Sequence, residues 1–197
     1  LLGQLEAHFD ALARFDPRAG APAGWAAAEA VRMISIQIAE FEETVDLKRD
    51  GPWGARVAQL KALTAQKAEA IIAKADAAVA DVLPLKRGLA AKMLRGSPRF
   101  DQAIGQEAQT RAEAILAFVE KSRPAAAAGG YASTRTKMIE KLDDRLDHYV
   151  EDVLEYLRSE APEQSDSAHA YLDVAARLIG LLRDEKAAQI VRRRAAA

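Results

Sequence analysis

The sequence contains no cysteine among its 197 residues. This absence excludes disulfide bonds, thiolate metal centres, iron–sulfur clusters and cysteine nucleophiles. No uninterrupted apolar run approaches the roughly 20 residues that a membrane-spanning helix requires. No segment sustains the alternation of apolar and polar residues that marks a half-buried strand. We therefore expect an all-α fold with no transmembrane segment.

Motifs for the common cofactors are also missing. The sequence has no Gly-x-Gly-x-x-Gly fingerprint, no Walker-type phosphate loop and no Gly-x-Ser-x-Gly elbow. None of its three histidines follows a glutamate at the Glu-x-x-His spacing of di-iron bundles. The 28 lysines and arginines against 29 acidic residues give a net charge of −1, which lacks the excess positive charge of a dedicated nucleic-acid binder. These absences favour a protein without a cofactor and without enzymatic activity.

Half of the residues are apolar, and 44 of the 197 are alanine. The larger apolar residues recur at steps of three and four, which predicts amphipathic helices with one buried face. Short connections between such helices favour an antiparallel bundle of five or six helices. The clearest stripes are Val31, Ile34, Ile38, Phe41 and Val45, then Ile139, Leu142, Leu146, Tyr149, Val153 and Leu157, then Leu172, Ala175, Ile179 and Leu182.

The region of about 54–122 predicts a long helical hairpin. Val57, Thr64 and Ile71 begin a seven-residue repeat whose many alanines allow close, coiled-coil-like packing. Pro84 falls inside this pattern, so we expect a kink or a division there. Ser97-Pro98 carries the residues of a helix start and predicts a helix over about 98–122.

The Ala/Gly run at 124–130 is the clearest candidate for a flexible linker. We expect a single helical domain over 1–197. The alternative is a division at this run into a bundle of residues 1–123 and a helical hairpin of residues 131–197.

Asp143, Asp144 and Asp147 form a possible metal site. The segment Asp143-Asp144-Arg145-Leu146-Asp147 matches, over five residues, the aspartate-rich DDxxD pattern with which isoprenoid synthases chelate magnesium diphosphate. Asp143 and Asp147 share a helix face, where two carboxylates could bind Mg²⁺. Residues 138–173 carry eleven acidic and three basic side chains, however, so the pattern is also typical of a solvated acidic face. We favour the acidic face and keep as an alternative a helical-bundle enzyme or ligand-binding protein with a Mg²⁺ site at Asp143 and Asp147.

A basic segment lies between Pro84 and Phe100. Its five cations are accompanied by no acidic residue and could bind a partner, nucleic acid or an anionic membrane surface. Cations near helix ends also simply complement the helix dipole. These residues are Lys86, Arg87, Lys92, Arg95 and Arg99.

Together these patterns predict a helical interaction or scaffold protein that binds another protein or a second copy of itself. The acidic and basic segments predict either internal ion pairs or head-to-tail association. Trp25 and Trp53 are expected to plug the ends of the bundle. The chain begins Leu1-Leu2-Gly3, which suggests a trimmed terminus, and nothing resembles a secretory signal, so we expect a cytoplasmic protein.

Overall fold

The computed structural model describes residues 2–44, 51–86, 97–159 and 163–196. Along them the chain is an all-α helical bundle, as the apolar spacing predicts. Two-residue strands and short 3-10 turns join some of the helices. The helices are α1 (Leu2–Ala13), α2 (Ala21–Thr44), α3 (Pro52–Ile72), α4 (Ala75–Val82), α5 (Gln106–Lys121), α6 (Ala132–Leu157), α7 (Ser165–Leu182) and α8 (Glu185–Ala195), and the strands are β1 (Leu85–Lys86) and β2 (Ser97–Pro98).

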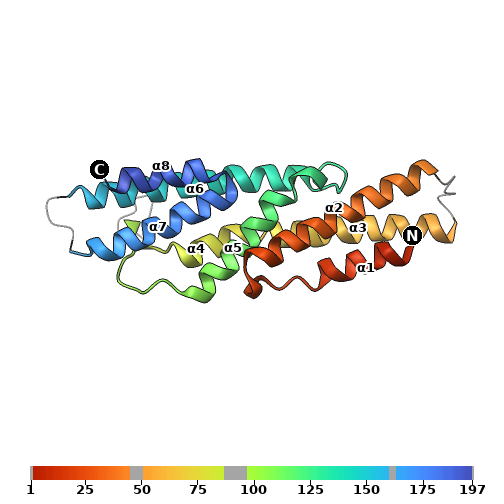
Figure 1. The fold of residues 1–197 in the computed structure, drawn as a ribbon, viewed down its shortest axis with the longest axis horizontal. Helices are drawn as coiled ribbons and strands as arrows, with labels where there is room; N and C mark the ends of the chain where they lie inside the picture. Colours follow the sequence, from red (N-terminus) through yellow and green to blue (C-terminus); the bar gives the residue numbers. More distant parts are fainter. Residues whose placement is uncertain (1, 45–50, 87–96, 160–162, 197) are drawn as a thin grey trace.

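The molecule is elongated, with α1, α2 and α3 in one half and α7 and α8 in the other (Figure 1). Helix α5 lies between the halves and packs against α2, α4 and α7. Every residue of α5 from Ala112 to Val119 is buried except Glu113. A helix buried almost all round is typical of the centre of a bundle.

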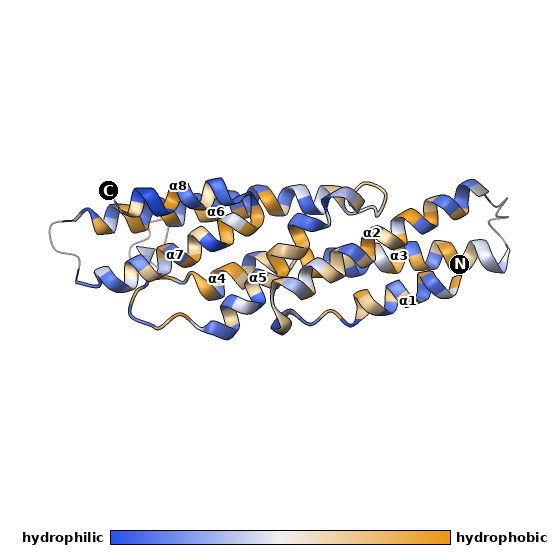
Figure 2. Cartoon of the chain, viewed as in Figure 1, coloured by the Kyte–Doolittle hydropathy of each residue, from blue (hydrophilic) through white to orange (hydrophobic). Residues whose placement is uncertain are grey.

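The predicted apolar stripes form the core. On α2, the residues from Val31 to Phe41 that occupy the stripe are buried, and Val45 lies outside the described residues. Figure 2 shows hydrophobic and hydrophilic residues on the same helices, as expected for helices with one buried face. The stripes of α6 and α7 contribute Leu142, Leu146, Tyr149, Val153, Leu172, Ala175, Ile179 and Leu182 to the same core.

The predicted long hairpin differs from the structure in its boundaries. The first helix is interrupted at Ala73 and Lys74, and it ends at Val82 rather than continuing to residue 95. Leu83 leaves the helical conformation (φ −114°, ψ 74°), because the residue before a proline is excluded from the α region. Pro84 therefore follows the end of a helix and does not kink one.

The second helix of that hairpin begins at Gln106 instead of 98. Ser97 and Pro98 pair antiparallel with Leu85 and Lys86. The ring of Phe100 packs against Tyr156 and Tyr171, with ring centroids 4.8 and 5.9 Å away. The Tyr171 hydroxyl donates to the carbonyl of Gln102 at 3.1 Å. These tertiary contacts hold residues 97–102 in a non-helical path.

The Ala/Gly segment forms a packed turn at the end of α5. Ala125 and Ala126 are buried, and Gly130 adopts the left-handed conformation (φ 78°) that favours glycine. The buried Tyr131 hydroxyl donates to the Ser122 carbonyl at 2.9 Å, and burial raises the pKa of Tyr131 to about 12. This segment connects α5 to α6 through defined contacts, unlike the flexible linker that its composition predicts.

Candidate functional site

The acidic side chains of α6 bind cations from elsewhere in the chain. Arg183, in the turn between α7 and α8, donates to Asp143 at 2.7 Å and to Asp147 at 2.8 Å. Arg194 of α8 donates to Glu151 at 2.6 Å. These three carboxylates are thus paired within the chain, but with arginines that lie outside the basic segment.

The same contacts bear on the possible magnesium site. Asp143 and Asp147 share one guanidinium, which a metal ion would have to displace, and Asp144 is exposed. Within the described ranges, no group of three or more histidine, aspartate or glutamate side chains is placed to hold a metal ion. Two carboxylates bridged by arginine make a structural clamp between α6 and the turn before α8.

Two residues of the basic segment can be placed. Lys86 is exposed on β1, and Arg99 binds Asp101 at 2.9 Å. The hydrogen bond from Arg99 lowers the pKa of the Asp101 carboxyl. Arg87, Lys92 and Arg95 lie outside the described residues. Arg99 is thus engaged by a neighbouring carboxylate, and Lys86 is the placed cation that faces solvent.

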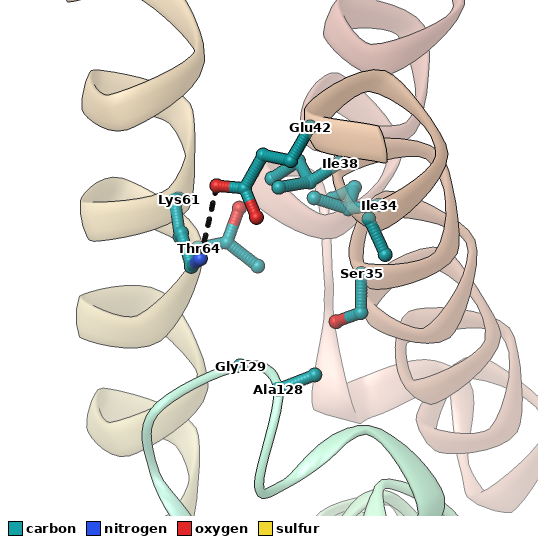
Figure 3. Close-up of a pocket in the computed structure, with 9 residues that line it drawn as sticks. Ile34, Ser35, Ile38, Glu42, Lys61, Thr64, Ala128 and Gly129 are labelled. Carbon is teal, nitrogen blue, oxygen red and sulfur yellow. Dashed lines mark hydrogen bonds and ion pairs between the residues drawn. The ribbon is translucent and has the colours of Figure 1, made fainter. Parts of the chain in front are cut away.

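A small pocket lies between α2, α3 and the turn that precedes α6 (Figure 3). Its volume is about 90 Å³, well below the roughly 300–1,000 Å³ of sites for drug-sized ligands. Its lining surface is mainly apolar and also includes one ion pair and two hydroxyls. The lining residues are Ile34, Ser35, Ile38, Ala39, Glu42, Lys61, Thr64, Ala128 and Gly129.

The polar groups of this pocket are already bonded. Lys61 Nζ lies 3.3 Å from the Glu42 carboxylate, and this pair spans from α3 to α2 (Figure 3). The Ser35 hydroxyl donates to Val31 and the Thr64 hydroxyl donates to Leu60, each within its own helix. Because these polar groups are engaged with one another or with their own helices, the part of the lining that stays unengaged is apolar.

The tryptophans do not plug the ends of the bundle. Trp25, near the start of α2, is 45% exposed, and Trp53, near the start of α3, is 55% exposed and stacks on Phe41. The outer face of α2 also leaves Ile36 exposed. Trp25 and Ile36 are eleven residues apart, about three helical turns, so they lie on one face. An ion pair between Glu29 and Arg32 (2.6 Å) lies between them in the sequence.

Helix α8 also carries an exposed apolar residue, Ile190, which the sequence analysis missed. The small residues Ala188 and Val191 pack inward, while Ile190 is 57% exposed. Asp184 caps the helix by accepting from the Ala187 amide at 2.8 Å. Asp184 is therefore a sequence feature from which the start of α8 could have been predicted. The exposure of Ile190 could not be predicted in the same way, because it depends on which face of α8 packs against α7.

Comparison of the chain with protein-family models, with curated proteins and with solved structures finds no match. In the part of the chain that the structure describes, no helix is both long and apolar enough to cross a membrane. The site residues above are therefore interpreted from their geometry alone.

Proposed function

We propose that this chain is a helical interaction protein that binds another protein chain on the outer face of α2. The observation that carries the proposal is the exposure of Trp25 and Ile36 on one face of that helix. Tryptophan is among the residues that contribute most binding energy at protein interfaces. Burial of two such side chains by a partner contributes roughly 25 cal/mol for each Å² of apolar surface removed from water.

The surroundings of this face support binding rather than catalysis. Ala39 lies three residues beyond Ile36 and also lines the pocket between α2 and α3, so this pocket borders one edge of the exposed face. The Glu29–Arg32 pair supplies polar groups beside the apolar ones. Apolar anchors with a polar surround are typical of protein interfaces.

A photo-crosslinking experiment tests the proposal. The full chain, carrying a photoreactive amino acid in place of Ile36, is irradiated in the cells that produce it. We expect one discrete protein adduct that Trp25→Asp abolishes. The matched control places the same amino acid at Gln66, an exposed polar position of α3. Adducts of equal yield at both positions, or none at Ile36, would contradict an interface on α2.

A further inference from the structure

The residues on the outer face of α2 have a spacing that is the same in both directions along the helix. They follow one another at steps of three, four, three, four and three residues, which keeps them on one face. Apolar residues occupy both ends of this series, and two opposite charges occupy its centre. In chain order the series is Pro22, Trp25, Glu29, Arg32, Ile36 and Ala39. All of them are exposed except Arg32, whose side chain is 43% exposed.

A second copy that lies antiparallel across this face presents the same residues in reverse order. The two-fold axis then passes midway between residues 29 and 32. Trp25 of one copy lies at the height of the partner's Ile36, and Glu29 lies at the height of the partner's Arg32. A parallel arrangement would instead place each charge opposite an equal charge. The face is therefore complementary to itself in the antiparallel arrangement only.

The central ion pair can join such a contact without being broken. The Arg32 guanidinium donates to the Glu29 carboxylate through Nε at 2.7 Å and through Nη2 at 2.6 Å. A guanidinium carries five N–H donors, and within the described ranges the Nη1 group of Arg32 has no hydrogen bond. Nη1 is thus left to donate to the partner's Glu29, whose carboxylate oxygens each accept more than one hydrogen bond.

From this self-complementary order we propose that the partner of the α2 face is a second copy of this chain, docked antiparallel on the same face. Trp25 packs beside the partner's Ile36 at both ends of the contact. At its centre the two Glu29–Arg32 pairs form one network of four charges. A chain of unrelated sequence would have to supply the same charges in reverse order between its own apolar residues. This inference rests on the proposed function and names its partner.

The symmetry of the contact determines its size. Trp25 and Ile36 are eleven residues apart, which corresponds to about 16 Å along the helix. The two-fold axis repeats each of them, so two tryptophans and two isoleucines lose contact with water. Because both copies use the same surface, the contact closes at two chains and leaves no α2 face for a third.

Analytical ultracentrifugation of the full chain over a range of concentrations tests this contact. We expect a mass of twice the 21.3 kDa of one chain. Glu29→Arg and Arg32→Glu each place like charges opposite one another, so each variant should return to the mass of one chain. Glu140→Arg and Lys137→Glu are the matched controls, because they make the same two changes three residues apart at exposed positions of α6. Both controls should remain dimers, and circular dichroism verifies that each variant is folded.

Mixing the two variants of α2 gives the sharper result. In a mixed pair, the two cations of the Glu29→Arg chain lie opposite the two carboxylates of the Arg32→Glu chain. The mixture should therefore form a one-to-one dimer, although neither variant associates alone. A mixture that stays at the mass of one chain would overturn the proposal. A wild-type chain that is monomeric at every concentration, or a dimer that both variants preserve, would do the same.

The cross-link at Ile36 separates this inference from the proposed function. A second copy predicts an adduct with the mass of two chains. If the adduct contains a different protein and the chain alone is monomeric, the inference fails and the proposed function stands. If no adduct forms at Ile36, both fail.

Discussion

Gly24 determines how closely two central helices approach. A Cβ atom at Gly24 would lie 2.0 Å from the carbonyl oxygen of Ala114 and 2.9 Å from the amide nitrogen of Phe118. Both atoms belong to the backbone of α5, which cannot move aside as a flexible side chain can. The absence of a side chain at this one position therefore allows α2 to cross α5 in direct contact.

We predict that Gly24→Ala destabilises the fold by about 3 kcal/mol, because α2 must move away from α5 and loosen the packing around it. Urea denaturation monitored by circular dichroism measures the change. Gly3→Ala is the control, since a Cβ atom at Gly3 of α1 meets no atom within 4 Å. Equal stability of the two variants would contradict the close approach.

Arg183 is the residue that ties the turn before α8 to α6. Removing it leaves Asp143 and Asp147 facing each other on one helix without their shared cation. We predict that Arg183→Gln lowers the free energy of unfolding by about 1 kcal/mol in dilute buffer. The loss should shrink in about 1 M salt, where the Debye length falls to about 3 Å.

Urea denaturation at both salt concentrations measures this effect. Arg158→Gln, at an exposed position after α6, removes the same charge and should change the stability little. A loss for Arg183→Gln that is independent of salt would indicate that the arginine acts through packing instead.

At the scale of helices, a contact from another element stabilises the end of α5. Arg135 of α6 donates to the carbonyl of Val119 at 2.6 Å, in the last turn of α5. A guanidinium at this position satisfies a carbonyl that the helix leaves open and complements the negative end of the helix dipole. The end of α5 is thus stabilised by a side chain of the next helix.

Asp76 links α4 to α6 through Lys141 at 2.9 Å and Arg145 at 2.7 Å. Partial burial acts to raise the pKa of Asp76, but the hydrogen bonds from Lys141 and Arg145 outweigh it and lower the pKa below its ordinary value. A carboxyl with a lowered pKa stabilises the folded state above its unfolded pKa of about 3.9, and this contribution is lost as the pH falls through the folded value.

We therefore predict that Asp76→Asn costs about 1 kcal/mol at neutral pH and that the difference from the wild type vanishes on acidification. Denaturation with urea at a series of pH values from 7 downwards measures it. Asp81→Asn, at an exposed position of the same helix, is the control. A difference that persists in acid would mean that the Asp76 carboxylate is not the stabilising species.

At the scale of the whole molecule, α5 couples the two halves. It packs on α2 in one half and on α7 in the other, and the fully buried Phe118 lies near its end, 6.2 Å from Phe15 between ring centroids. We predict that Phe118→Ala destabilises the molecule by about 3–5 kcal/mol. Because both halves share this helix, hydrogen exchange should accelerate together in α2 and α7.

Native-state hydrogen exchange with mass spectrometry measures both helices in one experiment. Exchange that accelerates in α2 alone, with α7 unchanged, would indicate that residues 131–197 form a separate unit. Ala26→Gly, at an exposed position of α2, is the control for a local effect confined to that helix.

The helical class and the core stripes could be predicted because they depend on local spacing. Apolar residues at steps of three and four place themselves on one face of a helix whatever its neighbours are, so Ile34 and Leu146 were identifiable as core. The end of α4 before Pro84 also has a local cause. The seven-residue repeat continues on both sides of Pro84, however, so the sequence favoured a helix that runs through it.

The candidate site depended on the arrangement of distant elements. The packing of distant elements decides which cation binds Asp143 and Asp147. It also decides the exposure of the two tryptophans and the position of the pocket. The spacing of residues along the sequence does not encode this packing. Arg183 reaches α6 across 36 residues of chain, and the pocket joins α2 and α3 with a turn near residue 129. Helix formation is a short-range property, whereas ion pairing and exposure are properties of the packed molecule.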